Sequence, residues 1–287
     1  MSRVAVICLC YNQANYVQKA LESVIAQTYH DWELIIVDDA STDNSLWEIE
    51  QFKLAHAQLP IKTIFLGTNI GNCRAFNQAL FSTDAKYVID LAADDMLLPD
   101  RVAQGVKNLD LHPEVAINFT NASFIDKEGE VYATHYPIGP LNKAAVNVPE
   151  GFVFEEIIAR YFICPPTTMI RTAALKAIGG YDENLAYEDF DMLVRLSEQH
   201  KFSYTDKILV QKRTLNSSMS SKQYRFGNRQ LASTLSICYK ILNLLKTTAQ
   251  KKALLKRVAF ESKQAIVNGR IGLFFGFLRL GIKTLLK

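Results

Sequence analysis

The sequence predicts an α/β protein built on a mixed, mostly parallel sheet flanked by helices. Three observations predict this fold class. Short apolar runs alternate with segments of helical periodicity through the first 112 residues, the connections between them are short, and the run Val4 to Cys10 is apolar throughout. A strand that is apolar at every position is buried on both faces, which is typical of a parallel sheet between two layers of helices.

The expected elements follow one another in a regular order. Apolar runs of strand length predict strands at 4–10, 33–37, 61–66 and 87–91. Apolar residues three and four positions apart predict helices at 16–25, 46–52 and 74–81. Beyond Pro113 we predict strands at 115–119 and 167–171, a turn and strand at 129–132, a loop at 135–151, and helices at 152–163, 175–178 and 188–200. Residues 1–220 are expected to form one domain with halves 1–112 and 113–220, followed by a helical region over 221–287.

Charge is distributed unevenly along the chain. The net charge of the whole chain is +3. From Lys240 to the C-terminus, however, there are 11 Lys and Arg residues and a single acid, Glu261. Leucines, isoleucines and phenylalanines alternate with these cations, which is typical of amphipathic helices. The pattern fits equally a helix that lies on an anionic membrane surface, an extension that packs on the body of the protein, and the contact of a homodimer.

The composition disfavours several classes of protein. An apolar fraction of 49% with 21% charged residues is that of a globular chain, not a disordered one. Five cysteines without C-x-x-C spacing predict neither a disulfide framework nor a zinc site. The absence of G-x-G-x-x-G and G-K-[ST] disfavours dehydrogenases and P-loop proteins, and nothing indicates a nucleic-acid partner. No signal-peptide pattern and no apolar stretch of about 18 residues occur, so we expect a soluble, cytoplasmic protein.

Two pairs of aspartates follow predicted strands. Asp38-Asp39 ends the second strand, and Asp94-Asp95 comes just after the fourth. In open α/β sheets the carboxyl ends of parallel strands bind ligands. A carboxylate there can bind a nucleobase or ribose, and a pair of them can hold a hard divalent cation. The alternative interpretation is that each pair caps the helix that follows it.

A third acidic cluster begins the helix predicted at 188–200. Glu188, Asp189 and Asp191 fall within its first turn, where acids also favour the helix dipole. Asp189 is the better candidate for a general base, because Asp191 is four residues before Arg195 and is expected to form a surface ion pair with it.

In their order these segments resemble the family 2 glycosyltransferases, inverting enzymes with a GT-A fold. The resemblance covers roughly residues 3–220 and is carried by segments spread along the whole of that range: Val4-Ala5-Val6-Ile7, Tyr11-Asn12, Ala20-Leu21-Glu22-Ser23-Val24, Trp32 to Asp43, Asn69-Ile70-Gly71, Arg74, Asn77, Tyr87 to Asp95, Leu98-Pro99-Asp100-Arg101, Gly179-Gly180-Tyr181-Asp182-Glu183 and Glu188 to Leu196. It implies transfer of a hexosyl-type sugar from a nucleotide-diphosphate sugar to an acceptor hydroxyl, in bacterial surface polysaccharide or glycolipid assembly.

The resemblance also implies roles for individual residues. The donor-binding residues are Tyr11, Asn12, Asp38, Asp39, Arg74 and Asp94. Asp94 and Asp95 would bind a divalent metal ion, Mn²⁺ or Mg²⁺, and Asp189 would be the general base. Residues 1–112 would then be the donor-binding half and 113–220 the acceptor-binding half. The acceptor would be a saccharide or lipid-linked saccharide, and with a lipid-linked acceptor the tail would attach the protein to the cytoplasmic face of the inner membrane.

Two positions depart from the family's pattern. Where the family often has a further aspartate at the metal site, this chain has Ala92. Where members often carry Arg-x-His, this chain reads Arg213-Thr214-Leu215, which leaves Arg213 as a candidate diphosphate contact. Two other functions remain as alternatives. A nucleotidyltransferase would need a glycine-rich, basic loop after the first strand, which is absent, and a non-catalytic relative that binds nucleotide sugars would be expected to lack Asp189.

Overall fold

The computed structural model describes residues 2–215 and 229–287, and its contacts divide the chain into two compact units. The first unit contains Met1–Gly151, Ile163–Tyr181 and Lys201–Thr214. The second contains Phe152–Phe162, Asp182–His200 and Leu215–Lys287. Two segments that precede residue 220 therefore group with the C-terminal helices, and a functional boundary at residue 220 stays a prediction.

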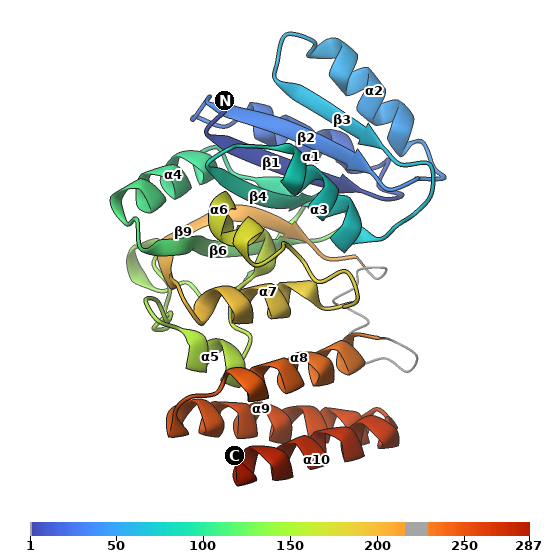
Figure 1. The fold of residues 1–287 in the computed structure, drawn as a ribbon. Helices are drawn as coiled ribbons and strands as arrows, with labels where there is room; N and C mark the ends of the chain where they lie inside the picture. The colour runs from blue at the N-terminus through green and yellow to red at the C-terminus, as the bar shows by residue number, and fades with distance from the viewer. Residues whose placement is uncertain (1, 216–228) are drawn as a thin grey trace. The chain divides into compact units, whose positions relative to one another are not determined.

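The first unit contains a mixed sheet with the strand order β3-β2-β1-β4-β8-β6-β9-β5, with β7 added on β6 (Figure 1). Its parallel part consists of β1 (Val4–Cys10), β2 (Trp32–Asp38), β3 (Ile61–Phe65) and β4 (Tyr87–Ala92). The remaining strands are β5 (Met96–Leu97), β6 (Val115–Ile125), β7 (Val131–Thr134), β8 (Met169–Arg171) and β9 (Lys201–Arg213). Strand β8 runs antiparallel to β4 and to β6, whereas β9 runs parallel to β6.

Helices cover both faces of the parallel part of the sheet. They are α1 (Val17–Ile25), α2 (Ser45–Ala55), α3 (Asn72–Ser82), α4 (Arg101–Leu111) and α6 (Thr172–Ala177), with 3₁₀ turns at Pro140–Asn142 and Pro165–Thr167. Alternate residues of β1, Val4 and Val6 among them, share one core cluster with apolar side chains of α1, α2 and α4. The residues between them, Ala5 and Ile7, are equally buried and by strand alternation lie on the opposite face. Helix α3 also packs on β1 (Figure 1). The prediction of a mixed sheet flanked by helices is confirmed.

The largest difference from the predicted elements is strand β9, which the sequence pattern did not indicate. Its thirteen residues include Asp206 and four basic side chains, and register shifts interrupt its pairing with β6. Bulges of this kind break the period of two by which a half-buried strand is identified. Strand β6 is also longer than predicted, because the buried polar residues Thr120 and Asn121 continue it beyond Phe119 and have their side chains hydrogen-bonded to backbone oxygens.

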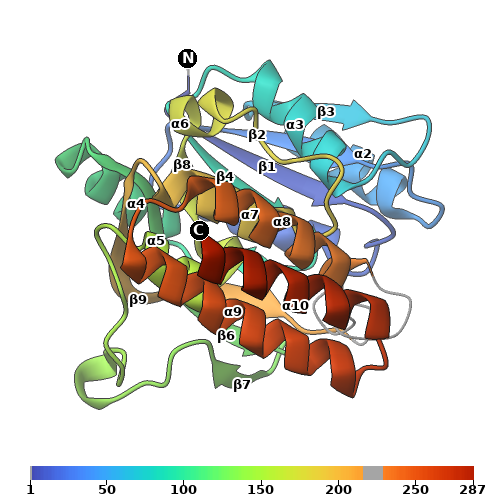
Figure 2. The ribbon, with the colours of Figure 1, turned by 60° about the horizontal axis from the view of Figure 1, so that its bottom comes forward.

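The second unit is helical. It contains α5 (Phe154–Ala159), α7 (Glu188–Ser197), α8 (Gln230–Leu244), α9 (Thr248–Val267) and α10 (Ile271–Leu286) (Figure 2). Arg257 of α9 is buried and donates hydrogen bonds to the carbonyl oxygens of Ile157 and Ile158 in α5. The predicted helical C-terminal extension is confirmed over 229–287, and part of it packs on earlier segments of the chain. No helix among the described residues combines the length and apolar character that crossing a bilayer requires.

Candidate active site

The ends of three adjacent strands meet at one edge of the sheet in the first unit. Register places Cys10 of β1 opposite Asp38 of β2, and Leu9 opposite Ala92 of β4. The segments that follow these strands carry most of the residues predicted to form the site. Parallel pairing thus brings together side chains that lie more than 80 residues apart in the sequence.

The loops after β1 and β2 are hydrogen-bonded to each other. Asn12 adopts a left-handed backbone conformation with φ of 55°, and its amide donates to Ser41 Oγ at 2.9 Å. Its side-chain oxygen accepts from the Thr42 amide at 2.7 Å. Tyr11, the first residue after β1, is 47% exposed and is not covered by this contact. Asn12 therefore fixes the loop, whereas the ring of Tyr11 remains accessible to a ligand.

The first aspartate pair is buried and does not cap helix α2. Asp38 accepts a hydrogen bond from the Ser41 amide at 2.9 Å, and its second oxygen is buried with no hydrogen-bond partner among the described residues. The two oxygens of Asp39 accept from the amides of Ile70 at 2.7 Å and Gly71 at 2.9 Å. Helix α2 has no side-chain capping hydrogen bond at its N-cap residue, although Asp43 Oδ1 accepts from the amide of its first residue, Ser45, at 2.9 Å. A buried carboxylate oxygen without a donor is costly, which favours a ligand donor at this position.

The Asp39 contacts also fix the loop that leads to Arg74. Gly71 has φ of +87°, a conformation that side chains with a Cβ rarely adopt, and it directly precedes α3. Arg74 is exposed in the first turn of that helix. Asp39 and the start of α3 are therefore held together, and the predicted grouping of Asp39 with Arg74 is compatible with the geometry.

The second aspartate pair lies on the turn between β4 and β5, six residues before helix α4. Because α4 begins at Arg101 with Asp100 at its N-cap position, Asp94 and Asp95 do not cap it. Asp95 is 4% exposed, and its Oδ1 accepts from the amide of Arg213 at 2.8 Å. Asp94 is only partly buried.

Burial makes this pair unfavourable in its fully ionised form. Desolvation, followed by the charge of the neighbouring Asp94, raises the pKa of the Asp95 carboxyl to about 8. Desolvation also raises the pKa of Asp94, although the nearby cations Arg213 and Lys212 oppose the shift. Two adjacent carboxylates that resist ionisation would be stabilised by a bound cation, so they fit a divalent metal ion. Within residues 2–215 and 229–287 no group of three or more His, Cys, Asp or Glu side chains has a metal-binding arrangement, consistent with Ala92 at the third position.

Arg213 at the end of β9 holds the loop that carries the second pair. Its guanidinium donates to the carbonyl oxygens of Asp94 at 3.2 Å and Asp126 at 2.6 Å. It also lies 4.6 Å from the ring centroid of Tyr16, and the side chain is buried. The sequence indicated Arg213 as a diphosphate contact, and the structure places it beside the aspartate pair with hydrogen bonds to backbone oxygens.

The third acidic cluster belongs to the second unit. Asp189 is partly buried in the first turn of α7. The predicted ion pair between Asp191 and Arg195 is confirmed at 2.6 Å, but its expected surface position is wrong, because the Asp191 side chain is 1% exposed. Packing of α8 against α7 covers it, and Lys240 Nζ of α8 also contacts Asp191 Oδ1 at 2.7 Å.

Two residues of α8 that sequence reasoning missed hold the segment before Asp189. Lys240 bridges Asp191 and Asp182, the latter at 2.6 Å, and Ser233 Oγ accepts from the Ala186 amide at 2.9 Å. The only sequence signal for Lys240 was its membership of the basic tail, which says nothing about a partner. Helix α8 thereby holds the segment before the acidic cluster and Asp191, the last residue of the cluster.

Comparison with known proteins identifies the family. The model of "Glycosyl transferase family 2" matches residues 5–179. EpsE of Bacillus subtilis (strain 168), a candidate glycosyltransferase by its name, is 29% identical over 200 residues, which cover 69% of this chain and 67% of that protein. The chondroitin synthase of Pasteurella multocida (strain Pm70) is 29% identical over 206 residues, 71% of this chain but only 20% of the synthase. The chain thus spans about a fifth of the length of that relative.

Solved structures agree in fold. S. aureus TarS 1–349 in complex with UDP-GlcNAc has a TM-score of 0.71 at 22% identity, covering 89% of this chain and 71% of that chain. A mannosyltransferase from Pyrobaculum calidifontis, in complex with GDP-Man and Mn²⁺, has a TM-score of 0.65 at 16% identity, covering 99% and 84%. Because the family model matches more than half of the sequence and these structures share the GT-A arrangement, the chain belongs to glycosyl transferase family 2.

Proposed function

We propose that this chain transfers a hexosyl-type sugar from a nucleoside diphosphate sugar to an acceptor hydroxyl. The observation that carries the proposal is the pair formed by the buried Asp95 and the partly buried Asp94, at the level where β1 and β2 also end. Their position at the carboxyl edge of the sheet, together with family membership, supports a site for a charged donor.

The donor's nucleoside would be bound at the ends of β1 and β2. Tyr11 offers an exposed ring, and Asp39 has a lone pair left on each oxygen after accepting from Ile70 and Gly71. The partnerless oxygen of Asp38 would accept a further donor from the ligand or from the solvent around it. Arg74 would approach from the start of α3. TarS was solved with UDP-GlcNAc and the Pyrobaculum enzyme with GDP-Man, which supports the ligand class without choosing the base or the sugar.

Asp94 and Asp95 would hold a divalent cation, Mn²⁺ or Mg²⁺, which neutralises negative charge on the departing diphosphate when it is bound. Within the chain itself, the Arg213 guanidinium fixes the carbonyl of Asp94, and its amide fixes one oxygen of Asp95. The turn is thereby oriented before any ligand binds. The cation of Arg213 also lies beside the site, so it would add positive potential to it.

Asp189 is the proposed general base. A carboxylate in the first turn of a helix is stabilised as an anion by the helix dipole, and it can accept the proton of an attacking hydroxyl. Direct attack by the acceptor would invert the configuration at the anomeric carbon. The acceptor would be a saccharide or a lipid-linked saccharide, in polysaccharide or glycolipid assembly on the cytoplasmic side of the membrane.

The proposal can be tested by ligand-induced thermal stabilisation of the full chain. A donor at a hundred times its Kd stabilises the native state by about 2.7 kcal/mol, a shift of several degrees in melting temperature. We expect this shift for one nucleoside diphosphate sugar in a panel with Mn²⁺, and a smaller shift with a chelator. Asp95→Asn should remove the metal-dependent part, whereas Asp84→Asn, at an exposed position, should not.

Turnover separates binding from chemistry in the same experiment. Asp189→Asn should abolish sugar transfer while it retains the donor-induced shift. If no nucleoside diphosphate sugar changes the melting temperature with Mn²⁺ present, the donor site is wrong. If Asp189→Asn turns over at the wild-type rate, another group is the base.

A further inference from the structure

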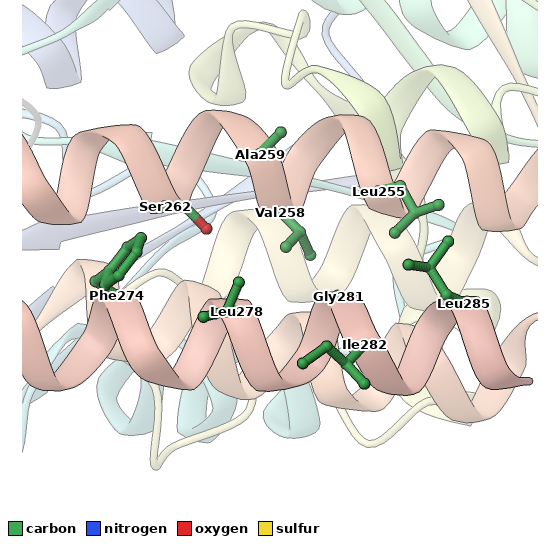
Figure 3. A pocket seen from close by; sticks show the side chains of 9 residues that line it. All are labelled: Leu255, Val258, Ala259, Ser262, Phe274, Leu278, Gly281, Ile282 and Leu285. Carbon is green, nitrogen blue, oxygen red and sulfur yellow. The ribbon is translucent and has the colours of Figure 1, made fainter.

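Helices α9 and α10 enclose an apolar groove of about 350 Å³ (Figure 3). Eight of the nine residues that line it are apolar or glycine, and Ser262 is the exception. The lining is Leu255, Val258, Ala259, Ser262, Phe274, Leu278, Gly281, Ile282 and Leu285. Apolar side chains from both helices therefore line one groove, and this groove is open on its outer side.

The outward side of α10 extends this groove into a continuous apolar strip. Exposed apolar residues recur at spacings of four and three, which place them on one side of the helix. They are Ile271, Phe275, Leu278, Ile282 and Leu285, of which Phe275 is 60% and Leu285 71% exposed. A helix of sixteen residues is ~24 Å long, so the strip is far larger than an isolated exposed side chain.

Cations border this strip on both long sides. On α9, the exposed residues Lys252, Lys256 and Lys263 lie on the same side of the helix as Ala259, which lines the groove. Lys252 comes seven residues before Ala259, and Lys263 comes four residues after it, which are spacings of one helix face. On α10, exposed Arg279 follows Phe275 by four residues, whereas Lys283 Nζ lies 5.4 Å from the ring centroid of Tyr239 in α8. The strip is apolar in its centre and positive at both margins.

No exposed acidic side chain of α9 or α10 offsets these charges. Glu261 is the only acid from Lys240 to the C-terminus, and it is 1% exposed and paired with Arg257 at 3.1 Å. The accessible surface of the α9–α10 pair thus carries charge of one sign. A second copy docked on this strip would bring like charges together, whereas a surface of anionic headgroups would complement them.

We infer that the strip of α9 and α10 lies on a membrane surface that contains anionic phospholipids. The apolar side chains enter the boundary between headgroups and acyl chains, and the bordering lysines and arginines contact lipid phosphates. This inference does not depend on the sugar-transfer reaction. It also gives the C-terminal helices a partner of defined chemistry, a lipid bilayer surface with net negative charge.

The test is flotation of the full chain with vesicles of phosphatidylcholine alone or with about 30% phosphatidylglycerol. We expect binding to the anionic vesicles that weakens as salt rises. Replacing Lys252, Lys256 and Lys263 together by Gln should lower the partition coefficient about a hundredfold, since each basic residue near the surface contributes roughly a fivefold factor. The double variant Phe275→Ser, Ile282→Ser should bind more weakly than the wild type to the vesicles with phosphatidylglycerol. It should also bind more weakly to vesicles that are richer in anionic lipid.

Matched controls remove the same charge or apolar surface elsewhere. Exposed Lys19, Lys107 and Lys207 changed together to Gln alter the net charge equally, and Leu54→Ser removes an exposed apolar side chain from α2. Both controls should bind as the wild type does. The inference would be overturned if the two triple lysine variants lost vesicle binding equally. It would also be overturned if the wild type bound neutral and anionic vesicles alike, or bound neither. A dimer in sedimentation velocity that the Phe275→Ser, Ile282→Ser variant abolishes, without lipid binding by the wild type, would assign the strip to a second copy.

Discussion

Lys240→Met should destabilise the second unit because it removes a cation that two carboxylates share. Lys240 Nζ lies 2.6 Å from Asp182 Oδ2 and 2.7 Å from Asp191 Oδ1. The Asp191 side chain is 1% exposed, and among the described residues it keeps the ion pair with Arg195 after the substitution. Methionine preserves most of the apolar stem, so the change isolates the loss of charge.

The magnitude follows from burial on each side of the pair. Removing one partner of a fully buried ion pair costs about 3–5 kcal/mol, and an exposed pair contributes about 0–1 kcal/mol. Lys240 is 39% exposed, and Asp191 retains a second cation, so we expect a loss of about 2 kcal/mol. At roughly 2–4 °C per kcal/mol for a chain of this size, the melting temperature should fall by about 4–8 °C.

The control is Lys246→Met, which breaks a pair of the same chemistry on the surface. Lys246 Nζ lies 2.7 Å from Glu198 Oε1, but the lysine side chain is 71% exposed. Its loss should shift the melting temperature by no more than about 2 °C. Equal shifts for the two variants, or no shift for Lys240→Met, would refute the argument that burial of Asp191 gives the Lys240 contact its weight.

The difference between wild type and Lys240→Met should also depend on pH. Burial raises the pKa of Asp182, but hydrogen bonds from Lys240 and Asn184 and the charge of Lys240 together outweigh it, so the pKa lies below its ordinary value. A carboxylate with a lowered folded-state pKa stabilises the protein above its ordinary pKa, and this contribution is lost as the pH falls through the folded-state value. Part of the free energy of unfolding that Lys240→Met loses comes from the contact with Asp182. This part should be lost at pH 7, and it should become smaller below about pH 4, where the carboxyl is protonated in the unfolded chain.

Two further predictions concern the first unit. Burial raises the pKa of Asp110, but hydrogen bonds from Lys86 and two other side chains hold it well below its usual range. Asp110→Asn should therefore destabilise the protein at pH 7 and much less near pH 2, as measured by denaturant unfolding at both values. At Gly105 an added Cβ would clash with Met169 Sδ, so Gly105→Ala should cost about 1–3 kcal/mol, whereas Gly67→Ala, with open space around it, should cost little by the same measurement.

The parallel part of the fold was predictable because its information is local. The run Val4–Cys10 matches β1 at both ends, since a strand buried on both faces is apolar without interruption. Helices α1 and α3 were likewise indicated by apolar residues at helical spacing. Strand β9 was not, because its pairing with β6 compensates for polar residues that the local pattern assigns to a loop.

The sequence predicted where the two aspartate pairs lie in the fold, but it did not predict their hydrogen-bond partners. Strand ends located Asp39 and Asp94 at one edge, yet only the structure shows that Asp39 bonds to Ile70 and Gly71 and that Asp95 bonds to the amide of Arg213. These contacts join residues 31 to 118 positions apart, and no spacing rule in the sequence encodes them. The same holds for Lys240, which charge counting grouped with surface cations.

Arg213 and Ala92 together determine the charge of the proposed metal site. A family site with a further aspartate would present three carboxylates, whereas this chain presents Asp94 and Asp95 beside the fixed cation of Arg213. Fewer anions and a neighbouring positive charge both weaken the attraction for a divalent ion. Burial acts in the opposite direction, because it raises the pKa of both acids and thus the benefit that a cation would bring. The position of Arg213 beside the pair therefore favours binding of metal together with an anionic diphosphate over binding of metal alone, since the diphosphate restores the negative charge that Ala92 leaves out.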